Sequence, residues 1–272
     1  MPVPAEEDTR RMVKHSPTPI PVARLIRAAK GFSCLTWGIP LGLLLFASKT
    51  VGLRGVIQVN GFSQLRLPAY ALAVVMIYLG MMHLYRAGAM TRSWGSYVHK
   101  GLFLSFLLMY FAPFFHWWDT RPYQTAYLVN VLLLLFSSIW LLYVTNQLAG
   151  LMGLALDDDT FYIEARLCGV AVILLMVLPY LGLIGYAVRG MIAHHSTLFA
   201  EMSQAPRALQ AWMLALFLLP VPLTMASTWK AREICLHRIA RLDTPVEETP
   251  AEPAAETHNP DLLTRVSPPP TD

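Results

Sequence analysis

Two histidines at the ends of neighbouring apolar segments are the residues of this sequence best placed to bind a cofactor. His83 lies near the end of one charge-free segment and His99 just before the next, so a short turn would bring the two rings close together. A pair of imidazoles can ligate a haem iron or a metal ion. Histidines at a membrane surface are also commonly solvated or hydrogen-bonded. We favour that alternative, and the sequence therefore predicts no tightly bound cofactor.

Three more histidines, His116, His194 and His195, are weaker metal candidates. They are predicted on the opposite side of the membrane from His83 and His99. His99 and His116 are 17 residues apart in the sequence, which corresponds to about 25 Å along a helix. They are therefore not expected to ligate one metal together.

Three consecutive aspartates, Asp157, Asp158 and Asp159, form an acidic cluster away from the two ends of the chain. Carboxylates in this number can hold magnesium. Together with Arg166 they resemble in part the motif of CDP-alcohol phosphotransferases, but the glycine expected after the second aspartate is missing. We favour a structural explanation, because carboxylates stabilise the N-terminal end of a helix.

These residues lie within or between six long segments that contain no Lys, Arg, Asp or Glu. The segments are residues 31–48, 67–85, 101–118, 122–156, 167–188 and 208–229. About 20 apolar residues of helix cross a hydrocarbon core of roughly 30 Å. A membrane-spanning backbone must satisfy its hydrogen bonds internally, and these segments lack the alternation of barrel strands. The sequence therefore predicts an all-α, polytopic transmembrane bundle of six spans.

The composition excludes several classes of protein. Hydrophobic residues make up 55% of the chain and charged residues only 14%, far below the roughly 25% of soluble domains. The net charge of +4 is distributed over segment ends rather than in one patch, so we expect no nucleic-acid partner. Proton relays, ion coupling and charged substrates within a bilayer usually depend on Asp, Glu, Lys or Arg, and these segments have none, which disfavours a pump driven by protons or sodium.

The distribution of basic residues predicts the orientation of the bundle. One side is predicted to hold Lys14, Arg24, Arg27, Lys30, Arg86, Arg92, Lys100, Arg166, Lys230, Arg232, Arg238 and Arg241, and the other Lys49, Arg54, Arg66, Arg121, Arg189 and Arg207. Basic residues are more frequent in cytoplasmic loops. We therefore predict a protein of the cytoplasmic (inner) membrane with both termini in the cytoplasm. The alternative is a re-entrant first segment, weakened by Gly38, Pro40 and Gly42, which would place the N-terminus outside.

The sequence divides into four parts. Residues 1–19 are polar and are predicted to be a disordered cytoplasmic tail. Residues 20–30 would have basic side chains on one side of a helix and apolar side chains on the other, as a short helix on the membrane surface does. Residues 31–242 form the transmembrane bundle. Residues 243–272 are rich in proline, glutamate and threonine, and are predicted to be a second disordered tail.

The fourth segment is the longest and carries most of the polar residues found at membrane depth. Its polar residues, which are expected to face protein rather than lipid, are Asn130, Ser137, Ser138, Thr145, Asn146 and Gln147. Its 35 residues exceed the length of a single span, so the segment either projects into the cytoplasm or breaks near Gly150 and Gly153. The predicted contact surface for a partner is Asn146, Leu151, Met152, Leu154 and Asp157.

No motif in the sequence names a reaction. The leading hypothesis is a non-catalytic accessory subunit of a membrane assembly, which would contact the lipid bilayer and another membrane protein. The second is a carrier or channel for a neutral or lipophilic solute. The third is a membrane-embedded enzyme or haem or metal protein that uses His83 and His99.

Overall fold

A computed structural model of the protein describes residues 20–50, 62–120, 124–194 and 219–243. The regular structure of these residues is entirely α-helical. The helices are α1 (Val22–Thr50), α2 (Phe62–Ala87), α3 (Trp94–Thr120), α4 (Thr125–Ala155), α5 (Asp159–His194) and α8 (Pro220–Asp243). The predicted disordered tails lie outside the described residues, apart from Asp243 at the end of α8.

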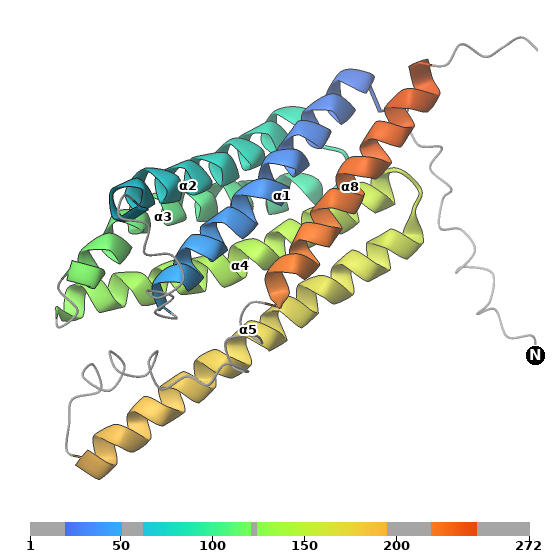
Figure 1. The fold of residues 1–272 in the computed structure, drawn as a ribbon. Helices are drawn as coiled ribbons and strands as arrows, with labels where there is room; N and C mark the ends of the chain where they lie inside the picture. The colour runs from blue at the N-terminus through green and yellow to red at the C-terminus, as the bar shows by residue number, and fades with distance from the viewer. Residues whose placement is uncertain (1–19, 51–61, 121–123, 195–218, 244–272) are drawn as a thin grey trace, which may run out of the picture.

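The helices pack side by side as a bundle (Figure 1). The most extensive contacts are those of α1 with α2 and α8, and those of α4 with α3 and α5. The second half of α5 extends away from the other helices (Figure 1). A continuous core of buried apolar side chains, which includes Leu35, Met81, Leu134 and Leu148, joins the packed helices.

Five of these helices are long and apolar enough to cross a membrane. Their apolar parts are Val22–Leu45, Ala69–Ala87, Trp94–Trp117, Val129–Ala155 and Asp159–Leu178. By helix length and hydropathy, the chain is an integral multi-pass membrane protein whose helices contact the bilayer. The predicted sixth span, residues 208–229, lies partly outside the described residues, and its described part begins α8.

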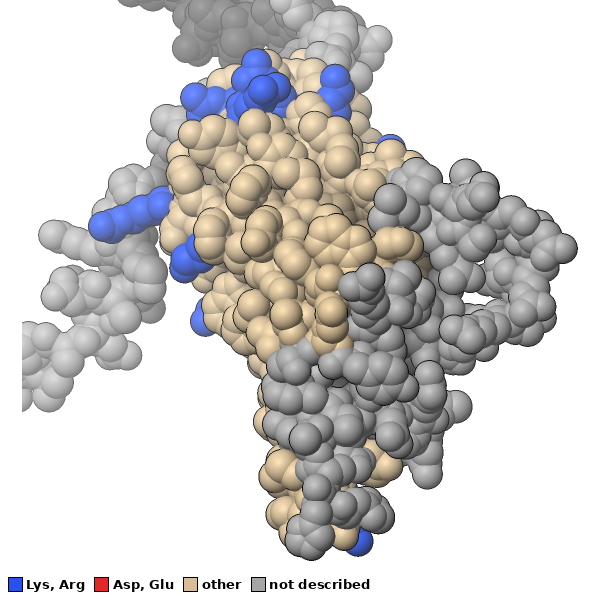
Figure 2. Space-filling view, turned by 90° about the vertical axis from the view of Figure 1, so that its left-hand side faces the viewer, with Lys and Arg blue, Asp and Glu red and all other residues tan. Residues whose placement is uncertain are grey.

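One end of the bundle carries most of the described basic residues. The start of α1 and the end of α2 meet there, since Arg27 Nη1 donates a hydrogen bond to the Arg86 carbonyl oxygen at 3.0 Å. The start of α3 lies beside them, because the rings of Tyr85 and His99 are 5.3 Å apart. In Figure 2 the largest group of Lys and Arg lies at the top end of the molecule, and no Asp or Glu is visible on that face. We call this end the basic end.

The first helix differs from the prediction. Residues 20–30 were expected to form a separate helix on the membrane surface, whereas Val22–Thr50 is one continuous helix. Its first turns bury Leu25, Ala28 and Ala29 within the protein. At Gly31, where the two predicted parts would join, the helix packs closely against α2: a β-carbon there would lie 2.9 Å from the Gly80 carbonyl oxygen.

Candidate functional site

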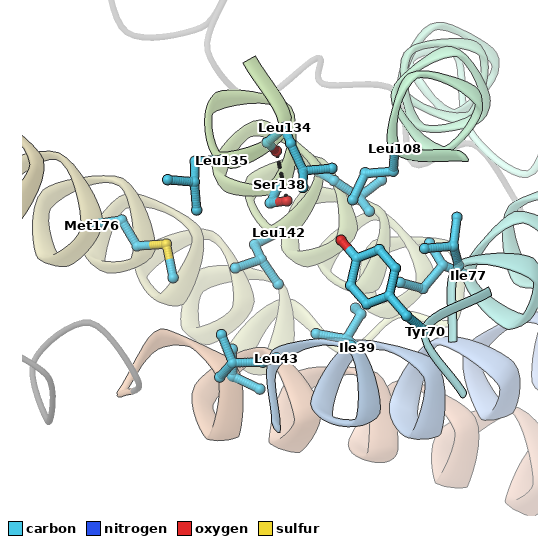
Figure 3. A pocket seen from close by; sticks show the side chains of 14 residues that line it. Ile39, Leu43, Tyr70, Ile77, Leu108, Leu134, Leu135, Ser138, Leu142 and Met176 are labelled. Atoms are coloured by element: carbon cyan, nitrogen blue, oxygen red, sulfur yellow. Dashed lines mark hydrogen bonds between the residues drawn. The ribbon is translucent and has the colours of Figure 1, made fainter. Parts of the chain in front are cut away.

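A partly open cavity lies in the middle of the bundle, among the described residues. It has a volume of about 80 Å³, and Figure 3 shows side chains of α1, α2, α3, α4 and α5 around it. The lining residues, mostly aliphatic, are Ile39, Gly42, Leu43, Tyr70, Val74, Ile77, Leu108, Leu134, Leu135, Ser138, Leu141, Leu142, Met176 and Val221. None of them carries a formal charge. The cavity therefore suits a neutral, apolar molecule.

Two hydroxyl groups interrupt this apolar lining. Tyr70 extends from α2 towards the space between α1 and α4 (Figure 3), and its ring lies 5.8 Å from that of Phe115. Ser138 donates its hydroxyl proton to the Leu134 carbonyl oxygen at 2.8 Å, within α4. Its oxygen can still accept a hydrogen bond. A ligand with one hydroxyl or carbonyl group could thus be oriented by these two side chains.

Buried polar side chains from α1, α4 and α8 meet close to the cavity. Thr36 donates to the Thr228 hydroxyl at 2.9 Å, and Asn146 Nδ2 donates to the Thr224 hydroxyl at 2.8 Å. These four residues and Thr145 are at most 1% exposed, and we call them the polar cluster. The expectation that the polar residues of the fourth segment face protein is confirmed for Ser137, Thr145, Asn146 and Gln147.

The polar cluster lies one helical turn from the cavity, on the side of the basic end. Thr36 precedes Ile39 by three residues, and Asn146 follows Leu142 by four. Thr224 follows Val221 by three. Three or four residues correspond to about 5 Å along a helix. From the basic end inwards, the bundle thus contains surface cations, then the polar cluster, then the apolar cavity.

Two atoms of the polar cluster have no hydrogen-bond partner among the described residues. They are Asn146 Oδ1 and Thr145 Oγ1, and both are buried. A buried polar atom left without a partner costs about 1–3 kcal/mol. These atoms are therefore where a bound polar group or a buried water would be most strongly favoured.

The structure places His83 near the end of α2 and His99 near the start of α3, both at the basic end. His99 Nδ1 lies 2.6 Å from the carbonyl oxygen of Gly95, one turn earlier in α3. The ring also packs edge-on against Tyr85. Both contacts lie within the protein, and they fit the hydrogen-bonded alternative for His99. His83 is partly buried on α2.

The remaining histidine candidates are separated along the chain. His116 is exposed near the end of α3, and His194 is the last residue of α5. His195 lies outside the described residues. Among the described residues, no group of three His, Cys, Asp or Glu side chains has the arrangement of a metal site.

The three aspartates form the turn between α4 and α5. The Asp158 backbone N–H donates to the Gly153 carbonyl oxygen at 2.9 Å, and that of Asp157 donates to the Leu154 carbonyl oxygen at 3.4 Å. These two bonds form a Schellman motif, in which Asp157 takes the left-handed conformation with φ of 63°. The Asp158 carboxylate then accepts a hydrogen bond from the Phe161 N–H at 2.9 Å. Asp158 therefore caps the start of α5.

The predicted contact surface at the end of α4 is largely inside the protein. Asn146 and Met152 are fully buried and Leu151 is 7% exposed. Leu154, at 41%, and Asp157 are the exposed members. α4 does not break at its glycines, because α5 packs against them: a β-carbon at Gly153 would lie 2.8 Å from Phe161 Cδ1.

The cavity was not predicted from the sequence. Ser138 was recognised as a polar residue within a membrane-spanning segment. Tyr70 lies near the start of its segment, where an aromatic residue at the membrane surface is common. Only packing brings these residues, which are 68 positions apart, to one hollow. The only signal in the sequence was that both residues carry a hydroxyl group within a charge-free segment. Many residues with a purely structural role have the same property.

Comparisons of the chain with protein-family models, with curated proteins and with solved structures found no match. The functional argument therefore rests on the geometry of the cavity, the polar cluster and the basic end.

Proposed function

We propose that this membrane protein binds and carries a neutral, lipophilic molecule, which occupies the cavity between α1, α2 and α4. The observation that supports the proposal is a cavity of about 80 Å³ with an uncharged, mostly aliphatic lining and two hydroxyls. Apolar cavities of this kind stay dry and accept apolar guests. The Tyr70 and Ser138 hydroxyls favour a guest with one polar group.

A photoreactive alcohol tests this proposal. The full chain, purified in mild detergent, is irradiated with 3-azioctanol, and the labelled residues are identified by peptide mass spectrometry. We expect labelling of cavity residues, Tyr70 foremost, and competition by unlabelled octanol. Labelling that spreads evenly over lipid-facing residues and resists competition would contradict the proposal.

Two glycine substitutions provide a matched comparison. Gly42 lines the cavity, and a β-carbon there would meet only Ala73 Cβ, at 3.8 Å, so Gly42→Leu fills the space without a backbone clash. Gly185 is exposed on α5, and a β-carbon added there would meet nothing within 4 Å. We expect Gly42→Leu to lower cavity labelling at least severalfold and Gly185→Leu to leave it unchanged. Equal labelling in both variants would place the guest elsewhere.

A second candidate is the accessory-subunit function predicted from the sequence. α5 supports it, because large apolar side chains are exposed along this helix: Leu167, Leu174, Leu178, Leu181 and Ile192. Lipid covers such side chains equally well, so this candidate ranks second. A stoichiometric protein that co-purifies under mild extraction would favour it, and a monodisperse single chain would argue against it.

We also propose that the basic end faces the cytoplasm, because basic residues accumulate on that side of membranes. Both termini would then be cytoplasmic. A single cysteine at Ser93, which is exposed between α2 and α3, should be shielded from an impermeant thiol reagent in intact cells after the native cysteines are replaced. Labelling of that cysteine from outside would reverse the orientation.

A further inference from the structure

At the basic end, the side chains of Arg24 and Arg27 reach from α1 to the end of α2, close to the backbone of Arg86 and Gly88. Arg27 Nη1 donates to the Arg86 carbonyl oxygen at 3.0 Å. Arg24 lies over the turn after α2, since a β-carbon at Gly88 would be 3.7 Å from Arg24 Cζ. Gly88 itself has φ of 81°, so glycine is the residue best suited to this turn. Arg24, Arg27 and Arg86 are all exposed, and we call them the arginine site.

Among the described residues of α1 and α2, no acidic side chain balances the charge of the arginine site. Residues 20–118 contain no aspartate or glutamate. The α2 C-terminus supplies a partial negative charge of about half an elementary charge, against three guanidinium groups. Arg27 uses one N–H on the Arg86 carbonyl, and a guanidinium has five. Within the part of the chain that the structure describes, most of the donors at this site thus remain available to an anion.

The other half of the basic end is different. Acidic residues accompany the cations there, and Lys230 of α8 forms an ion pair with Glu164 of α5. Orientation in the membrane requires basic residues on one side, but it does not require that one half lack acids. The excess at the arginine site therefore calls for a separate explanation.

Apolar side chains continue from the arginine site along the outer face of α2. Leu79 and Leu72 precede Arg86 by 7 and 14 residues, so all three lie on nearly the same side of the helix. Leu79 is 45% exposed and Leu72 is 55% exposed. A cationic group above an apolar track matches a phospholipid, with its phosphate at the water boundary and its acyl chain in the bilayer.

We propose that the arginine site binds the headgroup of an anionic phospholipid, whose acyl chain lies along Leu79 and Leu72. Guanidinium groups suit this role because their planar N–H pairs match two oxygens of one phosphate. The proposal is independent of the cavity and its guest, since it uses a different face of the protein.

Native mass spectrometry of the full chain tests this inference. The probes are dioleoylphosphatidylglycerol and dioleoylphosphatidylcholine, offered in equal amounts in mixed micelles. We expect the wild type to retain phosphatidylglycerol in preference to phosphatidylcholine. In Arg24→Gln/Arg27→Gln, we expect phosphatidylglycerol to bind at least about tenfold more weakly, because each Lys or Arg near an anionic lipid contributes to the free energy of binding. Equal retention of the two lipids by the wild type would overturn the proposal.

Two further variants keep the experiment decisive. Arg232→Gln/Arg238→Gln removes the same charge from α8 and should leave phosphatidylglycerol binding nearly intact; an equal loss would show that net charge alone matters. Arg24→Lys/Arg27→Lys keeps the charge but not the planar N–H pairs, and should bind phosphatidylglycerol with intermediate affinity. It replaces the glutamine variant in the test if that variant does not fold. Competition by inorganic phosphate at millimolar concentration would indicate a site for free anions and overturn the lipid assignment.

Discussion

Helix α1 forms two interfaces, one with α2 and one with α8, which we call the α1–α2 and α1–α8 seams. The two seams are stabilised by different contacts. The contact between α1 and α2 is made through glycines of both helices: a β-carbon at Gly80 of α2 would lie 2.9 Å from Leu35 Cγ and 3.0 Å from the Gly31 carbonyl oxygen of α1. Against α8, α1 presents a hydroxyl, since Thr36 donates to Thr228. Membrane helices use both solutions, small residues that allow close approach and polar residues that bond across the interface.

This difference predicts which of the two seams tolerates amino-acid substitution better. A close backbone contact has no room for an added atom, and separating the helices loses many van der Waals contacts at once. An interhelical hydrogen bond in a membrane protein contributes only about 0.6 kcal/mol on average. The α1–α2 seam should therefore be the more sensitive of the two.

The largest effect is expected at Gly80. We expect Gly80→Ala to lower the free energy of unfolding by about 1–3 kcal/mol or more, because its methyl group overlaps Leu35 and the Gly31 carbonyl. The measurement is thermal or denaturant unfolding of the purified protein. Gly185→Ala is the control, since its added methyl group would have no neighbour within 4 Å. Equal stabilities of the two variants would remove the proposed difference between the seams.

A smaller effect is expected where α1 meets α8. A double-mutant cycle of Thr36→Ala and Thr228→Ala should give a coupling energy of about 0.6 kcal/mol, and at most near 2 kcal/mol. Each single variant also loses packing, which the cycle subtracts. A coupling larger than the Gly80→Ala effect would reverse the ranking of the two seams.

The smallest effect is expected at the water boundary between α5 and α8. The Lys230 and Glu164 side chains are 46% and 53% exposed, and exposed ion pairs contribute about 0.2–1 kcal/mol. Glu164→Gln should therefore change stability only slightly, and the change should shrink further in high salt. A loss of several kcal/mol that persists in high salt would show that this contact is buried when the protein is in a membrane.

The sequence predicted the helical class because long charge-free segments have few other stable structures in a bilayer. It also predicted that Asn146 and Thr145 face protein, since lipid cannot satisfy their polar groups. It did not predict the α1–α2 seam: Gly38 and Gly42 were considered weaknesses of the first segment, whereas they face α2 in the structure. A glycine that permits close packing and one that weakens a helix look the same until the neighbouring helix is known.

The candidate sites were less predictable than the fold for the same reason. Leu151 and Met152 were predicted to form a contact surface because the fourth segment is longer than the bilayer is thick. In the structure, other helices of this chain bury both side chains. The cavity needs residues from six helices, and the arginine site needs α1 and α2 to meet. Hydropathy along one segment contains no information about which segments become neighbours.

The native residue Cys235 can report whether α8 is packed against the rest of the bundle. Its side chain is fully buried although it lies beyond the apolar part of the helix, and this burial raises the pKa of its thiol to about 12. Because the thiolate is the reactive form, the residue should remain unmodified by thiol reagents at neutral pH for as long as α8 stays packed. Its rate of modification then measures how often that helix detaches, without any engineered probe.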